Sequence, residues 1–499
     1  MPPKVAIIGA GIAGLSTASY LQRNGFDTEI HELHDKPGGL CAAWERKGFT
    51  FDGCIHWLMG SGPSSNLHEL WKELGAGDLE YIEWEEHVAL RLRDGGTFTV
   101  YTDPDRLEAE ILRLGPDDGA VAGEIARGVR RASRIDLPAA FDKLGWAERA
   151  RFLGHSAGAL PLALDFKRPV SALVAGMKSP ALREAFGAFF GAGMDGFPVA
   201  ALYLMLGAMA KGSAGYPIGG SRAFARAIEA KYLSLGGTIR YGSRIDEILV
   251  EGGRAVGVRG SAGESRADYV VSAGDARDAL KRLLGGRYAM PALDGAFEGR
   301  GALKPYPSLL FFGLGLGRDC RELPHGLSLP LAAPLVLEGG ALKVDRITLR
   351  TFNFDPSLAP PGKVSAVVML ETRGFDHWNG LAERDRAAYA AAKKAAGEAL
   401  VAAIDRSLPG FASAVEVVDV ATPRTFARYT NNWLGSYEGW LPGVGSFGRS
   451  IPRKVPGLDR LRLVGQWVNP GGGLPPCAID GRRLAKELCR SEGRRFSPD

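Results

Sequence analysis

Residues 4–21, with the sequence KVAIIGAGIAGLSTASYL, decide the fold of this chain. The apolar run 5–8 is typical of a strand buried on both faces, and residues 15–21 are typical of the helix that follows. The turn between them has the pattern G-x-G-x-x-G, formed by Gly9, Gly11 and Gly14. In such a turn the first glycine permits a tight bend, the second lets the backbone approach a pyrophosphate, and the third lets the helix pack on the strand. A helix N-terminus favours an anion, so the stretch predicts a bound dinucleotide.

A second strand and an acidic residue follow at the spacing that a dinucleotide site requires. Residues 27–32, DTEIHE, are typical of a strand, and Glu32 lies 18 residues past Gly14. At about this spacing a carboxylate reaches a ribose hydroxyl. The alternative is a glycine-rich βαβ turn that only packs. The ordered series of strand, glycines, helix, strand and acid favours the dinucleotide site.

Length and composition indicate a globular protein with more than one domain. The chain has 499 residues, of which 45% are hydrophobic and 23% charged, and its net charge of +5 gives no sign of nucleic-acid binding. Its five cysteines are scattered without a C-x-x-C pair, which predicts a reduced, cytoplasmic setting. His31 and His34 form an H-x-x-H pair without a third ligand nearby, so no metal site is expected.

The middle of the chain contains an apolar helical region. Residues 137–211 have helical periodicity, and their aromatic side chains suit either an apolar binding chamber or an ordinary core; these are Phe186, Phe189 and Phe190. The apolar run 197–210 has 14 residues and is too short to span a bilayer. It fits a core helix, the wall of a substrate tunnel or a patch that dips into a membrane.

The segment after the first βαβ unit resembles a known flavoprotein motif. Residues 37–39, PGG, form a turn, and residues 49–53, FTFDG, read as a short strand and turn. This arrangement resembles the GG motif of a flavoprotein group that includes amine oxidases, phytoene desaturases, carotenoid isomerases and GDP-dissociation inhibitors. Leu40 stands where the usual motif has an arginine, which removes a phosphate contact expected of that arginine. The resemblance implies that His56 passes near a flavin ring, either as an acid or base or as a structural residue.

Residues 216–275 resemble a second stretch of the phytoene desaturase family. A helix from Ser221 to Leu235, with Ser221 as its predicted N-cap, follows a Y-P-x-G-G turn. The resemblance implies that the strand containing Ile245 lies along the adenine. Residues 267–275, ADYVVSAGD, match the family pattern A-D-x-V-V-S-x-A-D. The alternative is a β-meander that binds no ligand.

Residues 309–317, LLFFGLGLG, also place glycines after a strand, but no helix follows and the spacing is G-x-G-x-G. We therefore expect a strand of the substrate domain here, and no second site for NAD(P)H. The electrons would then leave to O2, a quinone or another carrier, or return to the substrate.

The last glycine-rich block resembles the C-terminal flavin motif of the same family. Residues 461–464 read as a strand, Gly465 opens a turn, and the glycines at 471–473 precede a helix that begins near Leu474 and Pro475. An asparagine stands in place of the family's usual histidine in H-P-G-G-G-x-P. A helix N-terminus aimed at the ring stabilises the negative charge of a reduced flavin.

The three blocks fall in family order, and the chain is identified as a member of the phytoene desaturase and carotenoid isomerase family. The expected fold is α/β, with a discontinuous Rossmann-like FAD-binding domain and a substrate domain of mixed sheet and helices. The expected boundaries are 1–75, 213–285 and 455–499 for the FAD-binding domain, and 76–212 and 286–454 for the substrate-binding domain. The residues expected at FAD are Gly9, Gly11, Ile12, Ala13, Gly14, Glu32, Leu33, Gly38, Gly39, Leu40, Ile245, Ala273, Gly274, Gly465, Gly473, Leu474 and Pro475.

The resemblance implies non-covalent FAD and an apolar polyene or isoprenoid substrate. The expected reaction is desaturation, saturation or isomerisation by hydride transfer to or from flavin N5. One alternative is an amine-oxidase-type enzyme, whose aromatic cage would use Tyr437 and Trp467. Another is a non-catalytic binder of prenylated proteins similar to the GDP-dissociation inhibitors. Because polyenes dissolve in lipid, contact with a membrane surface is a further expectation.

Overall fold

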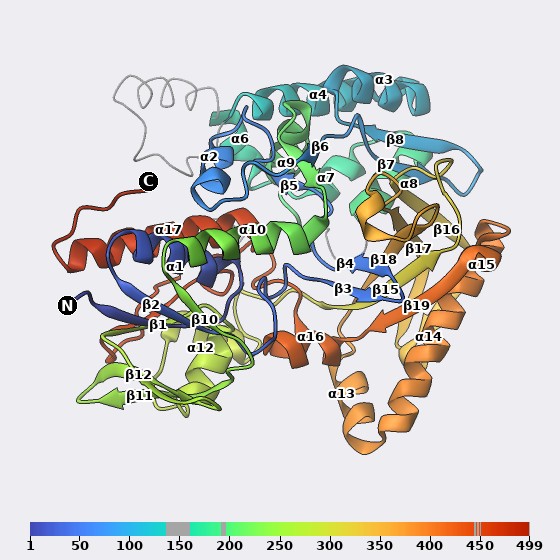
Figure 1. Cartoon of the computed structure of the whole chain (residues 1–499). Coiled ribbons are helices and arrows are strands. Elements are labelled where there is room, and N and C mark those ends of the chain that lie inside the picture. The colour runs from blue at the N-terminus through green and yellow to red at the C-terminus, as the bar shows by residue number, and fades with distance from the viewer. Residues whose placement is uncertain (136–159, 191–195, 444–445, 447–448, 450, 499) are drawn as a thin grey trace.

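The computed structural model describes residues 1–135, 160–190, 196–443, 446, 449 and 451–498, and its elements are arranged around two large sheets (Figure 1). Part of the predicted apolar helical region, residues 136–159 and 191–195, lies outside the described residues. The remainder of that region is helical, as predicted.

A parallel sheet holds the N-terminal strand at its centre. Its five strands lie in the order β10 (Thr238–Arg240), β2 (Asp27–His31), β1 (Lys4–Ile8), β14 (Tyr269–Ser272) and β20 (Leu461–Leu463). Three helices cover one face, where Val5 and Ile7 pack; they are α1 (Ile12–Arg23), α10 (Gly220–Ser234) and α17 (Leu474–Ser491) (Figure 1). Ala6 packs on the other face with the small sheet β11 (Ile245–Glu251), β12 (Arg254–Gly260) and β13 (Gly263–Arg266). The prediction of a strand buried on both faces is therefore confirmed.

The second large sheet is mixed, as predicted. Its strands lie in the order β19 (Val415–Ala421), β15 (Ser308–Leu316), β18 (Val364–Thr372), β17 (Leu342–Thr351), β16 (Gly326–Leu337), β7 (Glu86–Arg91) and β8 (Thr97–Tyr101). The pair β16 and β7 is parallel and the other pairs are antiparallel. The long helix α14 (Arg386–Ser407) packs on one face through Leu400 and Ile404.

The glycines of β15 make room for aromatic rings on the other face of this sheet. A Cβ at Gly313 would lie 2.4 Å from the ring of Phe51, and one at Gly315 would lie 2.7 Å from the ring of Phe49. Both phenylalanines belong to β4 (Phe49–Asp52), which pairs with β3 (Ala43–Arg46). The strand predicted at 309–317 is confirmed, and packing explains its glycines.

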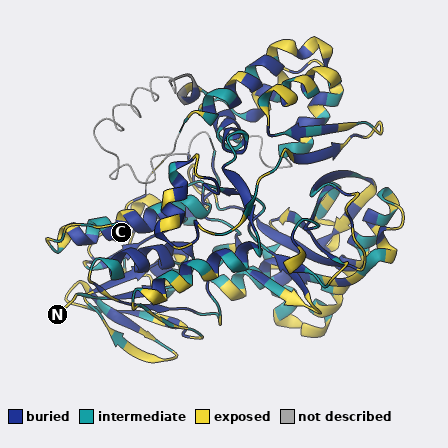
Figure 2. Cartoon of the chain, turned by 45° about the horizontal axis from the view of Figure 1, so that its top comes forward, coloured by how far each residue is buried: buried dark blue, intermediate teal, exposed yellow. Residues whose placement is uncertain are grey.

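A layer of helices covers the β7–β8 end of the mixed sheet. It consists of α3 (Pro104–Leu114), α4 (Gly119–Ser133), α6 (Leu160–Asp165), α7 (Val170–Ala175), α8 (Pro180–Phe190) and α9 (Val199–Ala210). Figure 2 shows exposed residues on the outer side of α3 and α4 and buried residues on the inner side. In the described part of the chain, no helix has the length and apolar character needed to cross a membrane.

Short elements connect these layers. They are β5 (Leu58–Met59), α2 (Asn66–Glu73), β6 (Tyr81–Ile82), η1 (Pro116–Asp118), β9 (Ala214–Pro217), α11 (Ala276–Asp278), η2 (Ala279–Leu283), α12 (Pro291–Phe297), η3 (Glu338–Gly340), η4 (Pro356–Leu358), α13 (Phe375–Arg384), α15 (Phe411–Ala414), α16 (Pro423–Thr430) and η5 (Trp433–Gly435). All five cysteines are free thiols. The division into two domains at the boundaries given above stays a prediction.

Candidate functional site

The cofactor residues predicted from separate parts of the sequence meet at one edge of the parallel sheet. Glu32, Gly9, Ala273 and Gly465 directly follow or lie just beyond the carboxyl ends of four neighbouring strands, β2, β1, β14 and β20. Main-chain hydrogen bonds join these ends: Gly9 N–H donates to His31 O at 2.8 Å and Ala273 N–H to Ile8 O at 3.0 Å. Open α/β sheets bind their ligands at this edge.

The first turn has the two kinds of glycine that a pyrophosphate site requires. A Cβ at Gly14 would lie 2.0 Å from the carbonyl oxygen of Gly9, so only glycine lets α1 begin this close to β1. A Cβ at Gly11 would be in van der Waals contact with the carbonyl oxygen of Gly38 at 3.9 Å, so a glycine keeps the surface of the turn free of side-chain atoms. Gly11 precedes α1 without a side-chain cap, and the N–H groups of Ile12 and Ala13 stand in the first turn, where they have no partner within the helix. The turn therefore offers free donors and the positive end of a helix dipole to an anion.

Glu32 lies beside this turn. Its carboxylate accepts hydrogen bonds from the N–H groups of Ala10, at 2.6 Å, and His34, at 2.8 Å. Burial raises the pKa of Glu32, and these hydrogen bonds act in the opposite direction. The main-chain oxygen of Glu32 accepts from Ser243 N–H at 2.8 Å, two residues before Ile245. The acid predicted for the ribose and the strand predicted for the adenine are thus neighbours.

The GG turn packs directly on the first turn. Gly38 N–H donates to Ala10 O at 2.9 Å, and Gly11 and Gly38 form an isolated parallel bridge. A Cβ at Gly39 would lie 3.2 Å from the Cα of Gly11. Leu40 and Leu33 are partly exposed at the same edge.

The C-terminal turn lies against the start of α1. A Cβ at Gly465 would lie 3.0 Å from the Cβ of Ala13. Gly473 precedes α17 with φ of +90° and without a side-chain cap. Pro475 and the proline after it lie in the first turn of α17 and have no N–H group. Only the N–H of Leu474 and the helix dipole therefore remain to stabilise an anion.

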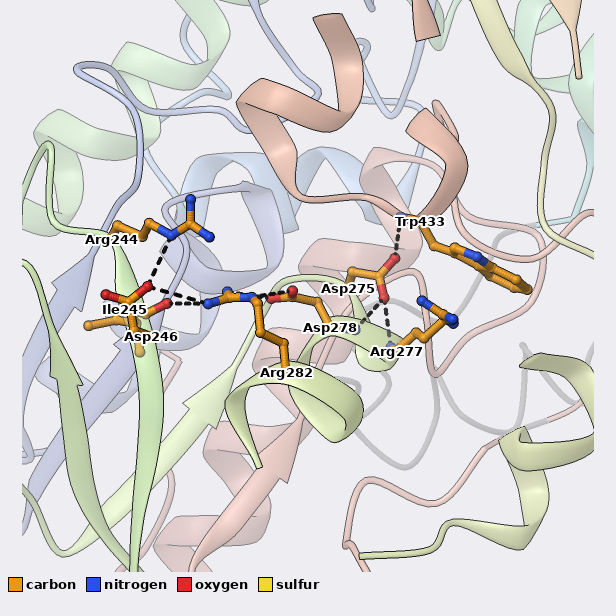
Figure 3. Close-up of polar contacts among 8 residues, drawn as sticks. All are labelled: Arg244, Ile245, Asp246, Asp275, Arg277, Asp278, Arg282 and Trp433. Atoms are coloured by element: carbon orange, nitrogen blue, oxygen red, sulfur yellow. Dashed lines mark hydrogen bonds and ion pairs between the residues drawn. The ribbon is translucent and has the colours of Figure 1, made fainter. Parts of the chain in front are cut away.

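A network of charged residues anchors Ile245, at the start of β11, and Asp275, just beyond the end of β14 (Figure 3). Arg282 donates to the carbonyl oxygen of Ile245 at 3.0 Å and to Asp278 at 2.7 Å. Asp275, next to Gly274, accepts from the N–H of Trp433 at 2.6 Å. Burial raises the pKa of Asp275 to about 7. Sequence reasoning missed these contacts, because Asp275 and Trp433 lie far apart in the chain.

Asp52 joins the GG segment to α10. Its Oδ1 accepts from Cys54 N–H at 2.9 Å, and its Oδ2 accepts from Ser221 N–H at 2.7 Å and Tyr216 O–H at 3.2 Å. The predicted N-cap role of Ser221 is wrong: α10 begins at Gly220, and the Ser221 hydroxyl donates to Asp52 at 2.5 Å.

Glu438 is a titratable residue beside the C-terminal glycine turn that sequence reasoning missed. A Cβ at Gly472 would lie 2.8 Å from its Oε2. Burial raises the pKa of Glu438 to about 7, a hydrogen bond with Tyr306 lowers it, and the charge of Glu371 raises it. Tyr437 donates to Glu371 Oε1 at 2.6 Å and lies 5.1 Å, between ring centroids, from Tyr306. Two carboxyl groups and two phenols therefore form one polar cluster next to the predicted flavin turn.

Tyr437 and Trp467, the two candidates for an aromatic cage, have different ring partners. Trp467 is buried, and its ring meets Trp440 edge-on at 5.1 Å. Its indole N–H donates to Asn432 at 3.4 Å. Within the described residues, no ring contact joins it to Tyr437.

His56 lies near two basic side chains of the mixed sheet. Burial, and then the charges of Arg350 and His87, lower the pKa of His56 well below its usual value, so the imidazole is neutral at pH 7. Its Nε2 is buried without a hydrogen-bond partner in the described part of the chain. His31 and His34 have separate partners: His31 lies 3.2 Å from Ser243 Oγ, and His34 pairs with Asp35.

Comparison with known proteins places the chain in a family. It belongs to the flavin-containing amine oxidoreductases, whose family model matches residues 12–489. The protein is therefore an oxidoreductase with FAD as its cofactor, as predicted, and the glycine turns and Glu32 fit that group because they leave free donors and open space at one sheet edge.

Individual relatives match over nearly the whole chain. A phytoene desaturase (neurosporene-forming) of Rhodobacter capsulatus is 27% identical over 97% of this chain and 94% of its own length. A chloroplastic prolycopene isomerase of Daucus carota is 24% identical over 98% of this chain and 80% of its own. The crystal structure of an oxidoreductase from Methanosarcina mazei has the same fold, with a TM-score of 0.60, 18% identity and coverage of 97% of this chain and 100% of that one. The predicted family resemblance and α/β fold are confirmed, whereas the roles of the individual site residues stay predictions.

Proposed function

We propose that the protein desaturates, saturates or isomerises C–C bonds of an apolar polyene or isoprenoid with FAD. The observation that carries this proposal is the meeting of three distant glycine turns at one sheet edge, in a chain similar over nearly its full length to a phytoene desaturase and a prolycopene isomerase. An amine-oxidase-type reaction is less well supported, because the relatives compared over nearly the whole chain are a phytoene desaturase and a prolycopene isomerase.

The helical layer has an apolar core against β8. Its side chains enclose a void with room for about one water molecule, and the lining consists of Phe98, Val100, Leu107, Phe186, Phe189, Leu202 and Leu206. The choice of a polyene or isoprenoid substrate therefore rests on the relatives, a phytoene desaturase and a prolycopene isomerase.

Residues of the chain itself would bind FAD, orient the reacting groups and hold or release a proton. The turns at Gly9–Gly14 and Gly38–Gly39 would hold the pyrophosphate, Glu32 the ribose, and the start of α17 the ring. When bound, FAD supplies a hydride acceptor or donor. Glu438 would hold or release a proton beside the ring, because its pKa of about 7 lets it exchange protons at neutral pH. Tyr306 and Tyr437 would orient this carboxyl group and Glu371.

The electron acceptor is proposed from the sequence to be O2 or a quinone. We also propose that the protein works in the cytoplasm and contacts a membrane surface where polyenes dissolve.

The experiment uses the holoenzyme under anaerobic conditions with two polyenes. Oxidised enzyme with phytoene and a soluble quinone should give products with longer conjugation, or dithionite-reduced enzyme with prolycopene should give all-trans-lycopene. Release of peroxide from aerobic enzyme with benzylamine or putrescine, and no change in either polyene, would favour amine oxidation and overturn the proposal.

A further inference from the structure

Arg350 is a partly buried cation without a counter-ion among the described residues. It lies on β17, opposite Gly326 of β16 and Val367 of β18. No hydrogen bond or ion pair joins its guanidinium to a residue within the described ranges. Burial lowers the pKa of Arg350 to about 10, so the side chain stays charged at pH 7. A partly buried guanidinium that has no counter-ion can pair with an anionic group of a ligand.

A second arginine on the same face of β17 forms an ion pair. Arg346, four residues earlier, donates to Glu184 Oε1 of α8 at 2.6 Å. Strand residues separated by an even number lie on one face, so the same sheet surface carries one paired and one unpaired guanidinium. The lack of a counter-ion is therefore specific to Arg350 and is not shared by Arg346 on the same face.

Three neutral histidines surround the unpaired charge. His325 directly precedes Gly326, the partner of Arg350 on β16. His87 lies on β7, on the far side of β16, and His56 lies in the loop before β5. Burial and then the charge of Arg350 lower the pKa of His87 to about 3 and that of His325 to about 4. At pH 7 these rings add polar atoms but no further positive charge.

Two further polar atoms in this group lack partners. His56 Nε2 and the indole N–H of Trp84 are buried without a hydrogen bond to any described residue. The Trp84 ring stacks on His325 at 3.9 Å with an angle of 17°. Buried polar atoms are normally satisfied. These two atoms, one on a ring stacked against His325 and one on a histidine near Arg350, therefore indicate polar partners that come from a ligand.

Apolar side chains lie next to this polar group. The ring of His87 meets the edge of Phe189 at 5.9 Å, and Phe189 lines the apolar void of the helical layer. A ligand bound at Arg350 would therefore have apolar side chains of the helical layer beside it. A single cation among neutral rings matches one negative charge, and the two N–H groups of a guanidinium match the two oxygens of a carboxylate.

We propose that Arg350, with His56, His87, His325 and Trp84, binds a carboxylate at one end of an otherwise apolar substrate. This inference rests on the proposed function and narrows its substrate to polyene or isoprenoid acids. Arg350 is then a specificity-determining residue, and its guanidinium forms hydrogen bonds to both carboxylate oxygens.

Binding of matched probes to the holoenzyme tests the proposal. Retinoic acid, retinol and methyl retinoate share one chain, and their binding is followed by quenching of tryptophan fluorescence. The acid should bind about tenfold or more tightly than the alcohol and the ester. In Arg350→Met the three probes should bind alike, whereas Arg350→Lys should keep part of the preference and Arg346→Met all of it.

Thermal unfolding gives a readout that a merely structural arginine would not produce. Removal of an unpaired, partly buried charge should raise the Tm of the ligand-free holoenzyme in Arg350→Met, whereas loss of the Glu184 pair should lower it in Arg346→Met. Any one of three results would overturn the proposal. The wild type binds acid and ester equally, inorganic phosphate at equal concentration displaces retinoic acid, or Arg350→Met has a lower Tm. If the enzyme still converts neutral polyenes while one of these results is found, the proposed function stands and only the carboxylate site is overturned. If polyene conversion and acid-selective binding both fail, the proposed function and the carboxylate site are both overturned.

Discussion

Two glycines of the site differ in what a side chain at their position would contact. Gly14 is required by the protein, since its Cβ would lie 2.0 Å from Gly9 O. Gly274 is not, because a Cβ there would meet nothing within 4 Å. If the open space at Gly274 belongs to the cofactor, a side chain placed there should interfere with FAD and with little else.

Gly274→Leu should raise the dissociation constant of FAD by about tenfold or more and leave the Tm of the FAD-free protein unchanged. The physical reason is steric overlap with the cofactor alone. Fluorescence titration of FAD into the stripped protein measures the affinity. Gly295→Leu in α12, where a Cβ also meets nothing within 4 Å, is the matched control. Wild-type FAD affinity in Gly274→Leu would show that the cofactor does not lie there.

Glu438 should make stability depend on pH in a defined direction. Its pKa is raised from 4.5 to about 7, so its contribution to stability is full below pH 4.5 and is lost as pH rises toward 7. At about 1.4 kcal/mol per pKa unit, the loss is about 3 kcal/mol.

Comparison with Glu438→Gln isolates this effect, because the buried histidines change stability in the opposite sense. The free energy of unfolding of wild type minus that of Glu438→Gln should fall by about 3 kcal/mol between pH 4.5 and pH 7. Urea unfolding across this range measures it, with exposed Glu398→Gln as the control. A difference that does not vary with pH would contradict the buried, proton-binding state of Glu438.

At the scale of elements, close packing of α1 on α17 holds the two ends of the site together. A Cβ at Gly481 would lie 2.8 Å from Ser16 Oγ, and the Ser16 hydroxyl donates to Ala478 O at 2.8 Å. Both helices begin at predicted FAD turns, so their spacing sets the distance between these turns.

Gly481→Val should destabilise the protein by about 1–3 kcal/mol, because the added atoms push the helices apart. It should also weaken FAD binding. Chemical unfolding and FAD titration measure the two effects. Gly380→Val in α13, where a Cβ meets only Arg384 at 4.0 Å, should cost much less. Equal losses in both variants would show that helix propensity, and not helix spacing, is responsible.

Local signals in the sequence predicted several elements correctly. The strand predicted at 309–317 is β15, and the strand predicted at 461–464 is β20. The three glycine turns of the sheet edge were found because each glycine pattern is contiguous in sequence. Asp52, Glu438 and Arg350 were missed because their environment comes from segments remote in the chain. Ser221 was misplaced because Gly219, in the left-handed region with φ of +81°, is the N-cap, so the helix begins two residues earlier than it would after a cap at Ser221.

At the scale of the whole molecule, the site depends on the beginning, the middle and the end of the chain at once. The parallel sheet draws its strands from all three parts, and the C-terminal segment returns to α1, where Arg494 donates to Gly25 O at 3.0 Å (Figure 1). A cofactor held by all three parts stabilises the native state alone.

FAD at about one hundred times its dissociation constant should therefore add about 2.7 kcal/mol to the free energy of unfolding of the wild-type protein. Gly274→Leu at the same FAD concentration should gain much less. Thermal unfolding with and without added FAD measures the gain. An equal gain in both proteins would place the cofactor elsewhere.

The visible absorption spectrum of the purified protein, recorded before and after heat denaturation, tests the central claim most directly. The structure and the family predict flavin bands from the native protein and free FAD in the supernatant after heating, at about one FAD per chain. A colourless protein that takes up no added FAD would contradict the claim and favour a binder of prenyl groups without flavin.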